Sequence, residues 1–380
     1  MRKRHGIILV AALLVLSSVL LTGCPKPPSE IETPMDPSSA GLPEPSDGPA
    51  EPAETYQVVV STKPGQLNLD ERVRGYRETF AGDYPQIEIV QEIDDETKYT
   101  VGEQQASAVM SANQDLDAFI GVNAASGPGV AAAVKAAGKT DSVTIVAMDA
   151  DSPLLDLVEE GVITASVAQR QYFMTYVGVK YLYGLKHGYC RVPGDTEADE
   201  SLIEIPAVID TGTVAVNADN VAVFRTRSQG AKEELAEKHP EWVELLSDRD
   251  ASEASAKEEY VTIGISTGVE YWNATKEGLK DVCAELGVKW TFDGPLEHKP
   301  DEQANVLDRI IARQPAGILI APGNPETLKP YIDKAMDAGI PVICIDTDSP
   351  DSKRIAYFGT SNYEAGVTGA HILAEALLGE

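Results

Sequence analysis

Short apolar segments of the strand type recur along this chain, and each is followed by a stretch with helical periodicity. The segments lie at 57–61, 87–90, 118–121 and 143–147, and again at 261–265, 288–291, 317–320 and 341–345. Strands that alternate with amphipathic helices are typical of a parallel sheet covered by helices on both faces. The sequence therefore predicts an α/β fold with two doubly wound parallel-sheet lobes joined by a hinge.

The two series of segments are separated by a stretch of different character. Residues 225–259 are highly charged with few apolar anchors, so we interpret them as a linker with some helix rather than as core. This places one lobe at 57–224 and the other at 260–380, and a predicted helix at 170–187 is expected to pack on the other lobe. A cleft between two lobes is a natural site for a small molecule.

The N-terminus has the build of an export signal. Arg2, Lys3 and Arg4 precede an apolar run from Ile7 to Leu21, which is short for a membrane span. The run ends in Leu-Thr-Gly-Cys24, which resembles the lipobox of bacterial lipoproteins. We therefore expect a signal peptide at 1–23, lipidation of Cys24 and a disordered Pro-rich tether at 24–56. The alternative is an ordinary signal peptide followed by a chance cysteine.

Composition excludes several classes of function. The formal net charge of -29 argues against nucleic acid as a partner, because phosphate backbones are bound by clustered Lys and Arg. Histidine is scarce, and Cys190, Cys283 and Cys344 fit no metal motif, so we expect no cofactor, no metal and no enzymatic activity. We expect buried free thiols at Cys283 and Cys344, while a disulfide stays possible in an oxidising compartment.

Several motifs in the second half resemble the first lobe of the type I periplasmic sugar-binding proteins, the ribose/galactose-type substrate-binding proteins of ABC transporters. A strand at 261–265 leads into Tyr271 and Trp272, where that family places aromatic residues. The segment 341–348, Pro-Val-Ile-Cys-Ile-Asp-Thr-Asp, is similar to the family's strand end, and 358–362 with Gly366 continues the match.

The first half resembles the second lobe of the same family, through the segments 72–76, 121–123, 148–151 and 165–169. The order of the lobes is therefore reversed relative to the family. We interpret the chain as circularly permuted, with 225–258 joining the old ends, since chain ends at surface positions tolerate such rearrangement. The alternative is a fragment of a tandem array.

The resemblance implies a set of ligand-binding residues on two facing walls. It assigns Arg72, Asn123, Asp149 and Gln169 to one wall and Tyr271, Trp272 and Asp346 to the other. Carboxylates, amides and guanidinium groups match the hydroxyls of a sugar, and aromatic rings cover its apolar face. Thr347 stands where ribose-type members have Arg, so a pentose is not assumed.

Each of these residues has a structural alternative. Asp149 and Asp346 follow predicted strands and could serve as turn or helix-capping residues, and Gln169 could cap the next helix. Asn123 could only shape a loop, Arg72 could form an ion pair on a helix surface, and Trp272 could belong to the core.

The resemblance implies an extracytoplasmic solute-binding lipoprotein of an ABC importer. Such a chain would be a monomer, periplasmic or on the cell surface, with a sugar or small polyol as ligand and a permease as partner. A sugar sensor that presents its closed form to a membrane receptor or chemotaxis protein is the alternative. A transcription regulator is disfavoured because an export signal, and no basic helix-turn-helix, precedes the lobes. An enzyme is disfavoured by the missing catalytic constellation.

Overall fold

The computed structural model describes residues 55–227, 231–247 and 255–379. The signal peptide expected at 1–23, the lipidation site Cys24 and most of the tether at 24–56 lie outside these residues. The described residues belong to one compact unit, Pro52–Glu380. In this part of the chain, no helix combines the length and hydrophobicity needed to cross a bilayer.

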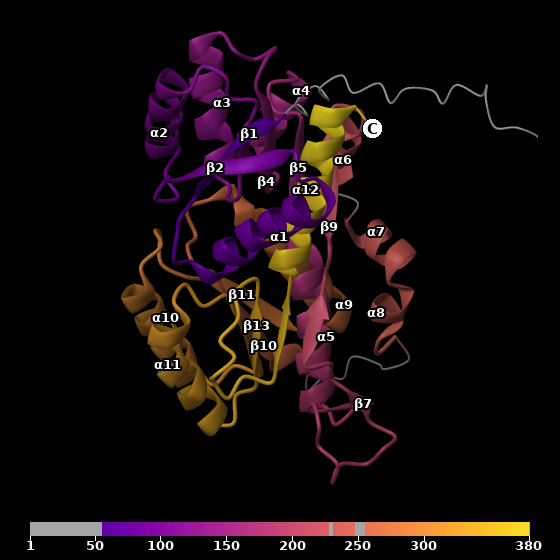
Figure 1. Cartoon of the computed structure of the whole chain (residues 1–380). Coiled ribbons are helices and arrows are strands. Elements are labelled where there is room, and N and C mark those ends of the chain that lie inside the picture. The colour runs from indigo at the N-terminus through magenta and orange to yellow at the C-terminus, as the bar shows by residue number, and fades with distance from the viewer. Residues whose placement is uncertain (1–54, 228–230, 248–254, 380) are drawn as a thin grey trace, which may run out of the picture. The chain divides into compact units, whose positions relative to one another are not determined.

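The first sheet has six strands in the order β2-β1-β3-β4-β5-β9 (Figure 1). All neighbours in this sheet are parallel except β5 and β9, which pair antiparallel. The strands are β1 (Tyr56–Thr62), β2 (Ile87–Asp94), β3 (Ala118–Gly121), β4 (Thr144–Met148), β5 (Ala165–Gln169) and β9 (Thr213–Asn217). The helices that pack with this sheet are α1 (Leu67–Asp83), α2 (Tyr99–Ala112), α3 (Ser126–Ala137), α4 (Ser152–Glu159), α6 (Val221–Arg227) and α12 (Asn362–Leu378).

The second sheet repeats this arrangement, with the order β11-β10-β12-β13-β14-β8 and parallel pairing throughout. Its strands are β10 (Glu259–Ile263), β11 (Lys289–Asp293), β12 (Gly317–Ile320), β13 (Val342–Ile345), β14 (Ala356–Gly359) and β8 (Val208–Asp210). Its helices are α5 (Gln171–Lys186), α9 (Asn273–Leu286), α10 (Pro300–Ala312) and α11 (Pro325–Asp337). Shorter elements are the 3₁₀ turns Ser255–Lys257 and Glu270–Trp272 and a two-stranded ribbon of β6 (Cys190–Arg191) and β7 (Ile203–Glu204).

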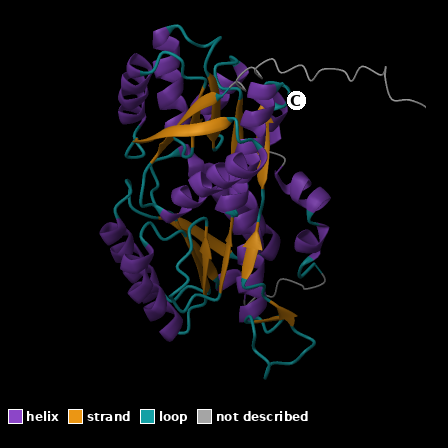
Figure 2. Cartoon of the chain, in the orientation of Figure 1, coloured by secondary structure: helices purple, strands orange, loops and turns teal. Residues whose placement is uncertain are grey.

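Each sheet is apolar on both faces, as the sequence pattern predicts for doubly wound sheets. Successive side chains of β1 alternate between two clusters: Val59 packs with α2, α3 and α4, whereas Val58 and Val60 pack with α1 and α12. In the second sheet, one face packs against α5 and α9 and the other against α10 and α11. Figure 2 shows these helices on both sides of the strands. The α/β class with two parallel-sheet lobes is confirmed.

Sheet membership does not follow the expected division into 57–224 and 260–380. Helix α5 follows β5 of the first sheet and, as expected for the helix at 170–187, packs on β12, β13 and α9 of the second. Strand β8 joins the second sheet before β9 returns to the first, and α12 leaves β14 to pack on α1. The chain therefore crosses between lobes at 169–171, 210–213 and 359–362. Periodicity shows that a helix has an apolar face but not which sheet that face covers.

The crossings at 210–213 and 359–362 are tied to each other. The Asp210 carboxylate accepts hydrogen bonds from the backbone N–H groups of Gly212 (2.9 Å) and Ser361 (3.0 Å). The Thr211 N–H donates to the carbonyl of Gly359 at 2.8 Å. These bonds hold the two crossing segments together, as expected of a hinge built from short element-terminal segments.

The linker differs from the expectation that 225–259 lies outside the core. Its helices α7 (Ala231–Lys238) and α8 (Pro240–Glu244) are charged, but Leu235, Leu245 and Leu246 are buried in the cluster formed by α5 and α9. The buried Lys180 of α5 donates to the carbonyl of Val243 and pairs with Glu285 at 2.9 Å. A few buried leucines suffice to anchor an otherwise polar segment to the core, and the high charge of the segment conceals them in the sequence.

We expect Leu235→Ala to lower the free energy of unfolding by about 2–5 kcal/mol, because the fully buried side chain leaves a cavity against α5. Glu237→Ala, two residues further along on the exposed side of the same helix, is the matched control and should stay within about 0.5 kcal/mol. Urea unfolding measures both. Equal midpoints for the two variants would show that the linker does not contribute to the core.

All three described cysteines are buried and free: Cys190, Cys283 and Cys344. Burial raises the pKa of the Cys190 thiol to about 11 and that of the other two to about 12. A thiol with so high a pKa is a poor nucleophile, so these side chains act as small core residues.

Candidate functional site

A cavity of about 980 Å³ opens at the carboxyl ends of the central strands of both sheets. Parallel strands in doubly wound sheets place the residues that follow them at this edge. The cavity is lined by residues from both lobes, and the structure brings all seven sequence-predicted residues to its wall: Arg72, Asn123, Asp149, Gln169, Tyr271, Trp272 and Asp346. We call it the main cavity.

Asp149 and Asp346 occupy equivalent positions in the two lobes. Each directly follows a central strand, β4 or β13, and each has a left-handed backbone, with φ of 75° and 62°. The Asp149 N–H donates to the Val167 carbonyl (3.0 Å) and the Asp346 N–H to the Phe358 carbonyl (3.2 Å). A non-glycine residue with positive φ is uncommon and is often associated with a functional position.

Gln169 holds the carboxylate of Asp149. Its Nε2 donates to Asp149 Oδ1 at 2.8 Å, and the hydroxyl of Ser166 donates to the Asp149 carbonyl at 2.6 Å. Burial raises the pKa of Asp149, while the charge of Arg72 and the bond from Gln169 oppose that rise. The Asp149 side chain does not cap a helix, because α4 begins after Asp151.

Tyr271 holds the carboxylate of Asp346 on the other wall. Its hydroxyl donates to Asp346 Oδ1, and the Thr347 hydroxyl donates to Oδ2 at 3.2 Å. Tyr357 donates to the Asp346 carbonyl at 2.9 Å. Burial raises the pKa of Asp346, and Tyr271 and Arg72 oppose it. The neighbouring Asp348 points elsewhere, since both its oxygens pair with Arg354.

Arg72 is buried in α1 and does not form the surface ion pair weighed as an alternative. Its Nη1 donates to the Val122 carbonyl and its Nε to Asn362 Oδ1, both at 2.8 Å. Its charge lowers the pKa of both Asp149 and Asp346, one from each lobe. Arg72 is therefore the cation that the two aspartates share.

Asn123 borders the cavity, but its polar atoms are engaged by the protein. Nδ2 donates to both oxygens of the fully buried Asp95, and Oδ1 accepts from the N–H groups of Ala125 and Ser126 at the start of α3. The geometry matches the alternative that Asn123 shapes the loop. Asp95, which also accepts from the Ser61 hydroxyl at 2.8 Å, was missed by sequence analysis.

Trp272 contributes to the cavity wall and to the core at once. Trp272 is 2% exposed, and its ring lies edge-on to that of Tyr271, with ring centroids 5.0 Å apart. The ring centroid of Phe292 lies 6.1 Å from that of Trp272. Trp272 fixes the position of Tyr271, which in turn holds Asp346.

Further lining residues were not predicted by sequence analysis. They include Lys63, Gln66, Glu96, Thr97, Lys98, Ser266 and His298. Glu96 and Thr97 have φ of 53° and 55°. The polar run at the end of β2, from Asp94 to Lys98, could have indicated Glu96, Thr97 and Lys98 as lining residues. Loops that follow parallel strands gather at the same edge of a sheet.

Asp151 carries the clearest pH dependence of the site. Burial, and then the charges of Asp149 and Glu270, raise its pKa to about 7. Between its ordinary pKa of 3.8 and about 7, the folded protein retains a proton that the unfolded chain has released. Stability therefore falls as pH rises through this range, and the loss is complete above about pH 7.

We expect Asp151→Asn to stabilise the protein at pH 8 by on the order of 1–2 kcal/mol, a figure reduced because the side chain is partly exposed. At pH 4 the variant and the wild type should be equal. Urea unfolding at both pH values tests this. An Asp151→Asn variant with the wild-type pH dependence would show that another group titrates.

This chain is similar to a protein family and to several solved structures. A family model described as periplasmic binding protein domain matches residues 52–189 and 260–380, more than half of the chain. Similar solved structures include the sugar-binding protein of a sugar ABC transporter from Bacillus halodurans, at 30% identity and a TM-score of 0.40. AraP, an arabinose binding protein from Geobacillus stearothermophilus, is 32% identical with a TM-score of 0.40. Each match covers 45% of this chain and 57% of the relative, so the chain spans little more than half of either relative's length.

A third match extends over most of the chain. A conserved domain protein from Vibrio cholerae is 16% identical, with 86% of each chain covered and a TM-score of 0.50. At this identity the match supports the fold alone.

Proposed function

Because this chain belongs to the periplasmic binding protein domain family, we propose that it binds a sugar or a similar small polyol in the main cavity. The observation that carries the proposal is the pair of equivalent aspartates, Asp149 and Asp346. They come from different lobes, line one cavity and share the charge of Arg72.

The chemistry of the wall suits a polyhydroxylated ligand. Two carboxylates accept hydrogen bonds from hydroxyl groups, and charge-assisted bonds of this kind are among the stronger ones. Nη2 of Arg72 makes no hydrogen bond within the described residues and can donate to a ligand oxygen. The ring of Tyr271 offers a flat face for the C–H side of a sugar.

The proposed role is delivery of the ligand to an ABC importer. Contacts from both walls favour the closed form over the open one, and a membrane permease can recognise that form. We propose that the protein acts outside the cytoplasm as a monomer, anchored by a lipid on Cys24. Mass spectrometry of the membrane fraction from the native host would detect the lipid, and an unmodified Cys24 would contradict the anchor.

A thermal-shift screen of aldopentoses and aldohexoses tests the ligand class. A sugar at 100 times its dissociation constant stabilises the folded protein by about 2.7 kcal/mol. We expect at least one sugar to raise the melting temperature of the wild type and to have little effect on Asp346→Ala. A folded protein that responds to none of these sugars would contradict the proposal.

We also infer that the order of the lobes is permuted relative to the family. Tyr56, next to the first described residue, and Leu377 and Leu378 near the last pack against one core cluster. A chain that ran from α12 directly into β1 would therefore need only a short connection.

A reordered chain tests this inference. In it, residue 379 is joined to residue 55 by a short Gly/Ser linker and the chain is opened at 228–230. We expect it to fold as a monomer and to bind the same sugar with unchanged affinity. Obligate association of this reordered chain would favour the alternative, a piece of a tandem array.

A further inference from the structure

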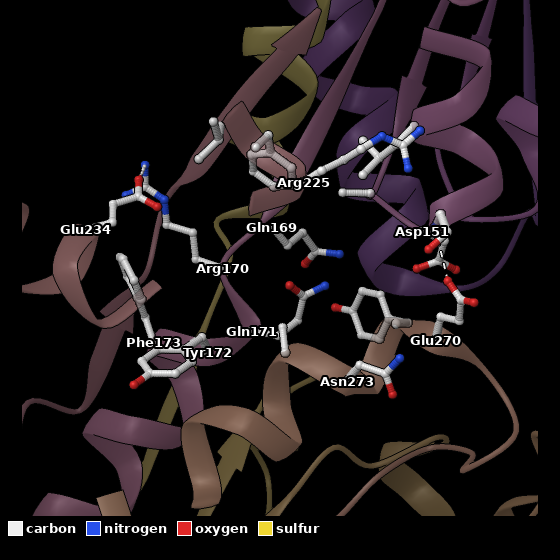
Figure 3. Close-up of a pocket in the computed structure, with 17 residues that line it drawn as sticks. Asp151, Gln169, Arg170, Gln171, Tyr172, Phe173, Arg225, Glu234, Glu270 and Asn273 are labelled. Atoms are coloured by element: carbon white, nitrogen blue, oxygen red, sulfur yellow. Dashed lines mark hydrogen bonds and ion pairs between the residues drawn. The ribbon is translucent and has the colours of Figure 1, made fainter. Parts of the chain in front are cut away.

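A second cavity of about 310 Å³ lies at the N-terminal end of α5 (Figure 3). We call it the α5 cavity. Its walls come from β5, α4 and α6 on one side and from α5, α9 and the turn at 270–272 on the other. Its volume falls at the lower end of the range typical of small-molecule sites, about 300–1,000 Å³.

Two carboxamides face this cavity. Gln169 is 7% exposed, and its Oε1 has no hydrogen-bond partner within the described residues. Gln171 is 9% exposed, and no hydrogen bond of its side chain is present in the same part of the chain. In Figure 3 both amides extend into the space, with Asn273 at its border. Because a buried polar atom without a partner costs free energy, Gln169 Oε1 indicates a site that a polar ligand completes, and Gln171 offers a second amide beside it.

Two carboxylates form one end of the cavity. Asp151 and Glu270 lie beside each other there (Figure 3), and burial, followed by the charges of Asp149 and Glu270, raises the pKa of Asp151 to about 7. Glu270 accepts the N–H of Ser152 at 3.1 Å, and Asp151 has no ion pair among the described residues.

The two arginines of the wall are engaged by other carboxylates. Arg170 pairs with Glu234 at 3.1 Å, at the opposite end of the cavity in Figure 3. Arg225 pairs with Asp156 at 2.5 Å and with Glu159 at 3.3 Å. Within the described residues, no ion pair joins a cation to Asp151 or Glu270 at the acidic end.

The α5 cavity is separated from the main cavity by side chains that the main cavity holds in place. Both cavities are lined by Asp151, Gln169 and Tyr271. Gln169 is bonded to Asp149, and Tyr271 is bonded to Asp346. Gln169 and Tyr271, held by these bonds, therefore lie between the two cavities.

We propose that the α5 cavity is a second binding site, for a small organic cation whose ammonium group is joined to hydroxyl groups, such as an amino sugar. The ammonium group is placed between the carboxylates of Asp151 and Glu270, and the hydroxyls donate to Gln169 Oε1 and bond to the amide of Gln171. This goes beyond the sugar site proposed above, which uses Asp149, Asp346 and Arg72. Gln169 contacts both sites and can couple them.

Titration calorimetry with D-glucosamine and D-glucose tests the proposal, because the two probes differ by one ammonium group in place of a hydroxyl. We expect D-glucosamine to bind the wild type and to lose about tenfold or more in affinity in Gln171→Met and in Glu270→Gln. Glu270→Gln keeps an acceptor for the Ser152 N–H and removes only the charge. Asn273→Ala, at an exposed position, tests the same wall if Gln171→Met fails to fold.

The main cavity supplies the control. Asp346→Ala should weaken binding of the neutral sugar found in the screen and leave D-glucosamine binding in place. Gln171→Met should weaken D-glucosamine binding and leave binding of the neutral sugar in place. The proposal is overturned if neither D-glucosamine, D-galactosamine nor ethanolamine binds, or if Asp346→Ala alone removes their binding. Failure of the sugar screen would count against the main cavity only.

Discussion

Replacing Asp149 or Asp346 with glycine should weaken sugar binding about 10- to 150-fold each, while the ligand-free protein becomes more stable. The loss corresponds to about 1.5–3 kcal/mol, the usual contribution of a hydrogen bond to a charged group. The ligand-free protein becomes more stable because glycine adopts the left-handed backbone of these two positions at no steric cost. A residue with a side chain costs about 1–2 kcal/mol there. Burial also disfavours both carboxylates in the empty cavity. Calorimetry measures the affinity and urea unfolding the stability.

Asp149→Ala and Gln314→Gly separate the two effects. Alanine removes the carboxylate but keeps the backbone strain, so binding should fall with a smaller gain in stability. Gln314 also has a positive φ, 54°, at the end of α10 and does not line the main cavity. Gln314→Gly should therefore raise stability and leave affinity unchanged. Unaltered sugar affinity in both aspartate variants would remove these residues from the site.

The fold was predictable from the sequence because the strands β1, β3, β4, β10, β12 and β13 are short apolar runs with helical patterns between them. Strands β5 and β14 were not identified as strands from their pattern. In β5, Ala165–Gln169, two of the five residues are polar and interrupt the apolar run. Both are strands because neighbouring strands complete their hydrogen bonds, and a local pattern does not report neighbours.

The positions of Asp149 and Asp346 beside one cavity were predictable because each follows an apolar strand. Their left-handed backbone was not, since aspartate adopts it only where surrounding structure requires it. The partners of Asn123 could not be predicted either, because Asp95 is separated from it by 28 residues and lies in the loop after another strand, β2. Residues that hold other residues in place are the part of a site that sequence patterns reveal least.

The contact between α1 and α12 is expected to link the stability of the protein to its sugar affinity. These helices cross with their backbones in contact at Gly75 and Gly366 (Figure 1). A Cβ at Gly366 would lie 2.1 Å from the carbonyl oxygen of Arg72, and one at Gly75 would lie 2.3 Å from that of Tyr363. Backbone atoms cannot rotate away as side chains do, so Gly366→Ala must push the helices apart. Overpacking of this kind costs about 1–3 kcal/mol, occasionally more.

Gly366→Ala should also reduce sugar affinity, because the two helices that it pushes apart carry Arg72 (α1) and its hydrogen-bond partner Asn362 (α12). Gly82→Ala is the matched control: it lies in α1, the helix that α12 contacts, and a Cβ there meets nothing within 4 Å. Since alanine favours a helix over glycine by about 0.5–1 kcal/mol, Gly82→Ala should be neutral or stabilising with unchanged affinity. Urea unfolding and calorimetry on both variants decide the matter. If Gly366→Ala unfolds at the midpoint of Gly82→Ala and binds sugar equally well, close packing of α1 on α12 does not position Arg72, and the shared cation must be held by Val122 alone.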